Sequence, residues 1–172
     1  MTPRRKKVLI GLAAVLVIVL LLPEWPCIPV ARATTRDWNL KSFWYGPWGR
    51  SGVHKGIDIF APKGTDVIAP TYGIVLLRGT IPVGGKVVLM IGPKFRLHYF
   101  AHLDAIDVGP CRPVLAGHVL GHVGSTGNAE GKPPHLHYAI LSLLPYPWRV
   151  DSSVQGWKKM FYLNPDAWLR GA

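Results

Sequence analysis

The sequence predicts an all-β fold made of short antiparallel strands, and three observations support this prediction. Glycine (19) and proline (16) are abundant among the 172 residues, which favours short strands and tight turns over long helices. Residues 73–78, 86–91 and 95–101 are short runs rich in β-branched or aromatic side chains and bounded by glycine or proline, as in an antiparallel meander. Hydrophobic residues make up 49% of the chain, enough to bury the core of one domain.

Residues 1–33 are expected to form an N-terminal membrane helix with a juxtamembrane segment. Four basic residues precede an uncharged apolar run over residues 8–22. As a helix, this run is about 22 Å long, short of a bilayer core of about 30 Å. We expect an uncleaved, single-pass signal anchor in the inner membrane, with the rest of the chain outside the cytoplasm. The alternative is a signal peptide cleaved after Ala33, which would release a periplasmic protein.

The net charge limits the classes of binding partner. The formal charge of +11 suits nucleic acid, anionic lipid or an anionic wall polymer, but it is partly concentrated at the N-terminus. No arginine-rich aromatic stripe accompanies it, so nucleic acid is not an expected partner.

The two cysteines, Cys27 and Cys111, are too few for a cysteine-rich zinc finger. An oxidising compartment would permit a bridge between them, but two unrelated thiols are the preferred interpretation.

The rest of the chain divides into an aromatic lead-in, residues 34–50, and a domain over residues 51–172. A sequence resembling a phosphate loop, residues 79–86, is rejected because its lysine comes one residue late and no Ser or Thr follows. The other expected elements are strands over residues 53–60, 66–70 and 119–123, a loop over residues 124–128, a strand from His135 to about Leu143, and a closing turn or short helix within residues 157–169.

Two short motifs indicate a metal site. His135 and His137 are two residues apart, so on a strand their side chains share one face. His54 and Asp58 are four apart and also share a face, with Gly56 between them leaving room. Two imidazoles and a carboxylate are the three ligands of a catalytic zinc site with a fourth position open to water. One imidazole of the His135–His137 pair is then left over.

A third histidine, His102, follows an apolar strand and completes a fixed order of motifs. That order resembles the lysostaphin-type zinc metallopeptidases, the LytM-like endopeptidases of bacterial cell walls, over about residues 38–168. The motifs that carry the resemblance are residues 54–59 (His-Lys-Gly-Ile-Asp-Ile), 61–65 (Ala-Pro-Lys-Gly-Thr), 99–103 (Tyr-Phe-Ala-His-Leu), 124–127 (Gly-Ser-Thr-Gly) and 134–138 (Pro-His-Leu-His-Tyr).

The resemblance implies a fold, a site and an activity. The fold would have two antiparallel sheets with zinc (Zn2+) in a groove on one of them. His54, Asp58 and His137 would be the zinc ligands, and His102 and His135 the two non-ligating catalytic histidines. We expect His135 to be the general base, since a neutral imidazole beside an activated water can accept its proton. The expected activity is hydrolysis of peptide bonds in peptidoglycan stems or cross-links.

Alternatives remain open from the sequence. Some LytM-like domains are non-catalytic regulators that bind and activate another wall hydrolase, although these characteristically lose ligands that are present here. A regulatory protein partner is also compatible with the chain. Tyr45, Trp48 and Arg50 are candidates to line the substrate groove, and the alternative is that residues 34–50 as a whole fold over the groove and block it. His98 is expected at the surface, or near the site by strand parity with His102.

Overall fold

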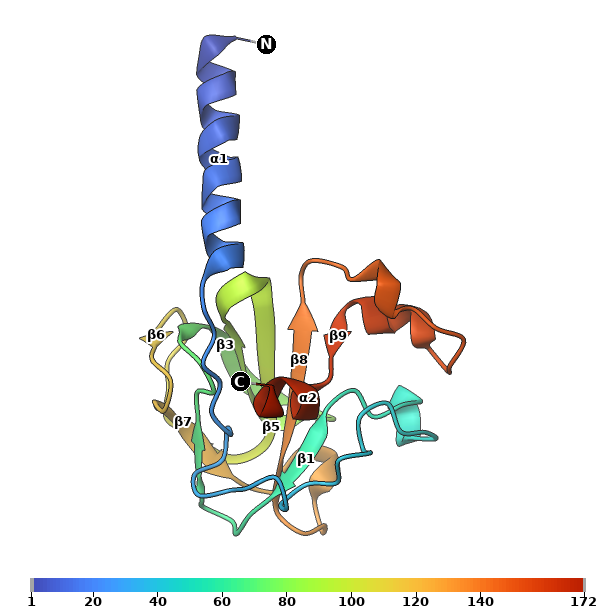
Figure 1. Ribbon diagram of the computed structural model, residues 1–172. Helices are drawn as coiled ribbons and strands as arrows, with labels where there is room; N and C mark the ends of the chain where they lie inside the picture. Colours follow the sequence, from blue (N-terminus) through green and yellow to red (C-terminus); the bar gives the residue numbers. More distant parts are fainter. Residues whose placement is uncertain (1, 172) are drawn as a thin grey trace.

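A computed structural model describes residues 2–171, apart from the side chain of Arg50. A long N-terminal helix stands on a β domain whose strands all pair antiparallel (Figure 1). The strands are β1 (Ile57–Phe60), β2 (Asp66–Ile68), β3 (Gly73–Ile81), β4 (Gly85–Ile91), β5 (Arg96–Ile106), β6 (Pro113–Val114), β7 (Val119–Val123), β8 (His135–Ser142) and β9 (Tyr162–Leu163). The helices are α1 (Pro3–Leu21), α2 (Pro165–Arg170) and the 3₁₀ turns η1 (Gly49–Ser51), η2 (Pro93–Phe95), η3 (Gly127–Ala129), η4 (Pro147–Arg149) and η5 (Gly156–Met160).

The strands form two antiparallel layers that share β5. The main sheet has the order β1-β8-β5-β4-β3-β6, and β2 and β7 form a smaller sheet joined to it where β7 pairs with the end of β5. The antiparallel all-β prediction is therefore confirmed, but the strand expected over residues 53–60 begins only at Ile57. The predicted closing helix is also present, because Asn164 caps α2 by accepting a hydrogen bond from the Asp166 N–H.

The core lies between the layers and explains the strand pattern. Alternate residues of β1 are buried and partly exposed, as expected for a strand with one covered face. The central strands β5 and β8 contribute the largest buried side chains, Phe100 and Tyr138, whose rings lie 5.4 Å apart. Leu120 of β7 is also fully buried, so the smaller sheet closes the same core.

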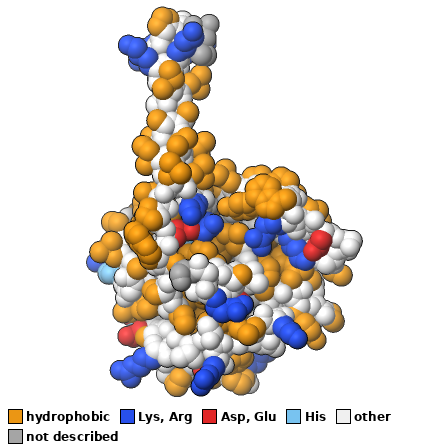
Figure 2. Space-filling model, viewed as in Figure 1, with side chains coloured by type: hydrophobic (Ala, Val, Ile, Leu, Met, Phe, Trp, Pro, Cys, Tyr) orange, Lys and Arg blue, Asp and Glu red, His pale blue; other side chains and the backbone are white. Residues whose placement is uncertain are grey.

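The N-terminal region has two parts that behave differently. Helix α1 buries no residue, and hydrophobic side chains are exposed along its length (Figure 2). Within residues 2–171, no helix is both long enough and apolar enough to cross a membrane. The following segment packs on the domain instead: Val30 is buried and bridges Val67, and the Cys27 N–H donates to the Pro70 carbonyl. Cys27 and Cys111 are both free thiols, as expected.

His98 corrects the sequence prediction, since it lies neither at the surface nor beside the motif histidines. It is fully buried on the face of β5 opposite the site, where its Nδ1 lies 2.7 Å from the Tyr138 hydroxyl and its ring 5.1 Å from that of Trp168. Packing of α2, from the far end of the chain, creates this environment. Burial, helped by the charge of Arg96, lowers the pKa of His98 to about 3.

We therefore expect acid to destabilise the fold through His98. Between about pH 6.5 and pH 3 the unfolded chain binds a proton at this residue that the folded chain does not, so the free energy of unfolding falls as pH falls. The slope from one such group is at most about 1.4 kcal/mol per pH unit. Denaturant titrations of the metal-free chain at several pH values should show a shallower dependence for His98→Gln than for the wild type. An equal slope in both would contradict the assignment.

Candidate metal and catalytic site

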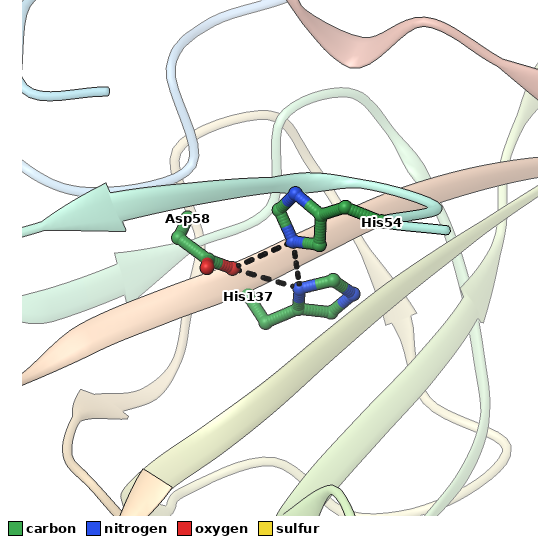
Figure 3. Close-up of side chains that lie close together, drawn as sticks. All are labelled: His54, Asp58 and His137. Atoms are coloured by element: carbon green, nitrogen blue, oxygen red, sulfur yellow. Dashed lines mark hydrogen bonds and ion pairs between the residues drawn. The ribbon is translucent and has the colours of Figure 1, made fainter. Parts of the chain in front are cut away.

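Three predicted ligand residues converge where β1 pairs with β8. Asp58 lies directly opposite His137 in the strand register, and His54 precedes β1 by one short turn. Asp58 Oδ1 is 2.8 Å from His137 Nδ1 and 3.1 Å from His54 Nε2, and the two nitrogens are 3.1 Å apart (Figure 3). One ligand atom from each residue points to a common position, but His54 lies outside β1, so strand parity does not account for its placement.

The chemistry of these three atoms fits a zinc ion. Ligand atoms at about 2.0–2.1 Å from a tetrahedral zinc are separated by roughly 3.3 Å, close to the spacing found here. The His54 Nδ1–H donates to the Ser42 carbonyl at 3.1 Å, so its Nε2 presents a lone pair to the cluster. Burial raises the pKa of Asp58, but the imidazoles of His137 and His54 outweigh it and hold that pKa well below its usual range. The carboxylate is therefore ionised, as a metal ligand must be.

The other two predicted histidines, His102 and His135, lie next to this cluster. Their rings are 5.1 Å apart, and the ring of His102 is 6.0 Å from that of His137. In each, Nδ1–H donates at 2.8 Å to a backbone carbonyl, Thr126 for His102 and Pro133 for His135. A carbonyl only accepts, so each Nε2 carries the free lone pair. Burial lowers the pKa of His102 to about 4, which keeps that ring neutral near pH 7.

The loop over residues 124–127 builds the support for His102. Thr126 donates its hydroxyl hydrogen to the Leu103 carbonyl at 2.9 Å, and its own carbonyl orients the His102 ring. Gly127 has φ +70°, and a Cβ there would lie 2.3 Å from the Gly85 nitrogen, so only glycine fits. This Gly-Ser-Thr-Gly motif therefore has a positioning role, which its sequence alone did not reveal.

A backbone irregularity brings His102 to the site, and strand periodicity did not predict it. Ala101 pairs with His137, so regular alternation would send the next side chain to the opposite face. His102 instead has φ +65°, and the register of β5 shifts beyond it, so its side chain returns to the site face. Non-glycine residues with such φ values are uncommon and cluster at functional positions.

Aromatic side chains surround the cluster. Trp48 stacks on the ring of His54 with centroids 4.2 Å apart, and this helps to bury His54 to 1% exposure. Trp48 remains 39% exposed and Tyr45, edge-on to it, 57%, so both predicted groove residues lie beside the site. The side chain of Arg50, the third candidate, lies outside those described. Two further neighbours were missed by sequence reasoning: Phe60, 5.3 Å from the His135 ring, and Tyr99, 6.3 Å from that of His137.

The lead-in over residues 34–50 packs mainly on the domain. Trp38 is buried in the core, where its Nε1–H donates to Asp166 Oδ1 at 3.0 Å. Backbone hydrogen bonds join Trp44 and Tyr45 to His54 in both directions. Asp58 and His137 keep 16% and 18% of their side chains exposed, so the lead-in leaves the metal position partly open to solvent.

Gly56 is expected to be indispensable to this geometry. A Cβ at this position would lie 2.4 Å from the Tyr138 carbonyl and within 3.0 Å of two ring atoms of His137. Gly56→Ala should therefore displace His137 and weaken zinc binding by about 10- to 100-fold, the size of effect seen when support for a ligand is lost. Zinc affinity by competition with a chelator tests this, with Gly109→Ala as the matched control because nothing lies within 4 Å of its added Cβ. Unchanged affinity in Gly56→Ala would contradict the expectation.

The fold and the site together define a metallopeptidase of the lysostaphin type. The model of Peptidase family M23 matches residues 52–146, more than half of the chain. The chain therefore belongs to peptidase family M23, and the resemblance seen in the motifs is confirmed.

Individual relatives agree with this membership. The chain is 34% identical over 143 residues to the L-Ala--D-Glu endopeptidase of Bacillus subtilis, covering 73% of this chain and 42% of that protein. It is 32% identical over 103 residues to lysostaphin of Staphylococcus simulans, covering 57% of this chain and 20% of that protein. The catalytic domain of the same lysostaphin superposes with a TM-score of 0.59 at 25% identity, covering 81% of this chain and 99% of that domain. The chain thus spans less than half the length of these two relatives.

Proposed function

We propose that this protein is a zinc-dependent endopeptidase that hydrolyses peptide bonds in the stems or cross-links of peptidoglycan during cell-wall remodelling. The single observation that carries the proposal is the convergence of His54, Asp58 and His137 beside His102 and His135, whose Nδ1 atoms are each held by a backbone carbonyl. Two curated relatives support the substrate class, since their names describe an L-Ala--D-Glu endopeptidase and a glycyl-glycine endopeptidase.

Peptide hydrolysis would use both a zinc ion and the two histidines that do not bind it. A zinc ion held by His54, Asp58 and His137 would lower the pKa of a water molecule and polarise the scissile carbonyl. His135 Nε2 accepts the proton of the attacking water and returns it to the leaving amine. His102 Nε2, the acceptor atom of a neutral ring, accepts a hydrogen bond from the second hydrogen of the attacking water and so orients it. Hydrogen bonds to the Pro133 and Thr126 carbonyls hold both rings ready for these roles.

The second candidate is a regulator that binds and activates another wall hydrolase without cutting. A regulator needs no ligand set, whereas this chain holds the complete triangle of ligand atoms and orients both additional imidazoles. The enzyme is therefore the preferred proposal, and a regulatory protein partner is compatible with it.

The full chain should release soluble peptide fragments from purified peptidoglycan, and removal of zinc by a chelator should abolish the release. Added zinc should restore it. Mass spectrometry of the fragments would identify the bond that is cut. A zinc-loaded chain that cuts nothing, yet stimulates a second wall hydrolase, would replace the enzyme with the regulator. The full chain is needed because residues before 34 contribute Val30 to the core.

We also propose that residues 8–22 hold the chain at the inner membrane, with the domain outside the cytoplasm. Support comes from the basic residues before an uncharged apolar run and from the absence of any buried residue in α1. Cleavage after Ala33, the alternative, would remove Val30 from the core. Flotation of the full chain with vesicles, compared with a variant carrying Leu12→Lys and Leu16→Lys, tests the anchoring. Equal recovery of both would contradict it.

A further inference from the structure

A second apolar surface lies beside the end of α1. Leu143, Trp148 and Val150 are 54%, 78% and 43% exposed, and we call them the apolar shoulder. They occupy the connection from β8 into η4, which in Figure 1 rises to the level of the last turns of α1. Figure 2 shows hydrophobic side chains gathered along this upper edge of the domain beside the helix.

The 3₁₀ turn η2 connects the shoulder to the helix. Helix α1 contacts η2, and the Leu143 N–H donates to the carbonyl of Phe95, the last residue of η2, at 3.0 Å. The ring of Trp148 packs edge-on against that of Tyr146 at 5.3 Å, and most of it is exposed. The exposed side chains of Leu21 and Trp25 continue the apolar surface at the base of α1.

Charge on the same side is positive. Glu24 is nearly buried, forms an ion pair with Arg96, and lies 3.6 Å from Lys94. Arg149, in η4, is close enough to Arg96 for the two charges to affect each other. Lys94 and Arg96 therefore outnumber the single carboxylate of Glu24, and Arg149 adds a further positive charge near Arg96. Exposed tryptophan with neighbouring basic side chains is the combination that favours the interface of a bilayer containing anionic lipid.

The metal site lies at the other end of the same strand. His135 and His137 are in the first three residues of β8, whereas Leu143 directly follows its last residue. Eight residues of extended strand span roughly 25 Å, so a surface that holds the shoulder leaves the site at the far end of the domain.

We propose that the apolar shoulder, with Lys94 and Arg149, rests on the anionic lipid surface that α1 enters and so directs the metal site away from the membrane. This inference rests on the proposed membrane anchoring. The occupant is lipid because the shoulder lies beside the end of α1, whose apolar side chains are exposed, and because its surrounding charge is complementary to anionic headgroups.

Site-specific labels on the full chain test the proposal. In a Cys27→Ala, Cys111→Ser background, a fluorophore is attached at Trp148→Cys or, as the matched control, at Val83→Cys. Val83 is 55% exposed in the hairpin between β3 and β4, at the end of β4 opposite η2. Vesicles of phosphatidylcholine with phosphatidylglycerol carry a nitroxide quencher just below the headgroups.

The label at position 148 should be quenched at least several-fold more than the label at position 83. Adding Arg149→Glu should reduce quenching at 148, with zinc content unchanged. Equally weak quenching at both positions would overturn the proposal. So would an emission change at 148 that follows protein concentration without lipid, because that would indicate a second copy on the shoulder. A chain that fails to float with the vesicles would instead contradict the anchoring itself.

Discussion

His137→Ala should bind almost no zinc and release no peptide from peptidoglycan, whereas the wild type should hold about one zinc per chain. The substitution removes one corner of a triangle in which Nδ1 of His137 lies 2.8 Å from Asp58 Oδ1 and 3.1 Å from His54 Nε2. Two protein ligands are fewer than the three that catalytic zinc sites use. Metal analysis after dialysis and fragment release from purified wall material measure the two effects together.

The matched control for this experiment is His118→Ala. His118 is an exposed histidine in the connection between β6 and β7, and its removal should leave both zinc content and activity unchanged. If His137→Ala kept its zinc and its activity, the ligand assignment would be wrong. If it kept zinc and lost only activity, His137 would belong with the proton-transfer groups.

His135→Ala should keep its zinc and lose about 10²- to 10⁴-fold in turnover, the contribution typical of a general acid–base group. His135 does not contribute an atom to the ligand triangle, and its Nδ1 is occupied by the Pro133 carbonyl. Loss of a proton acceptor should lower kcat with little change in KM, since substrate binding does not depend on it. Steady-state kinetics on a soluble peptide from the wall, with metal analysis of the same sample, provides the measurement.

His102→Ala is the informative companion to His135→Ala. Removing an acceptor that orients the attacking water should also lower kcat, by about 10²-fold, without loss of zinc. If either variant lost zinc in proportion to its loss of activity, the substitution would act by weakening zinc binding and not by removing a catalytic group. Wild-type activity in His135→Ala would exclude that residue as the base.

Much of the ligand set could be predicted because strand geometry is local. His135 and His137 are both on β8 and share a face as their spacing predicts, whereas His54 precedes β1 and reaches Asp58 through a turn that strand geometry does not describe. The choice between His135 and His137 could not follow from periodicity, because both point to the same face. It depends on the register that places Asp58 opposite His137, a contact between segments about 80 residues apart. The family resemblance supplied that choice.

Other features depend on contacts that no local pattern encodes. His102 reaches the site through a positive φ that interrupts strand alternation. His98 was expected near the surface because histidine is polar, yet Trp168 from the end of the chain covers it. The boundary placed at residue 33 followed from a resemblance to a cleavage site, whereas the structure places Val30 in the core with the domain.

The contacts after α1 have a mechanical consequence. Pro23 accepts a hydrogen bond from the Tyr72 hydroxyl, and Glu24 pairs with Arg96, so the domain begins within three residues of the helix end. No flexible linker separates α1 from the domain. Under the proposed anchoring, the metal site would stay at one distance from the membrane surface. The protein would then cut only those wall strands that lie at that distance. It would find substrate by lateral diffusion in the plane of the membrane. Inserting a few glycines between α1 and the domain would widen the range of distances at which it can cut.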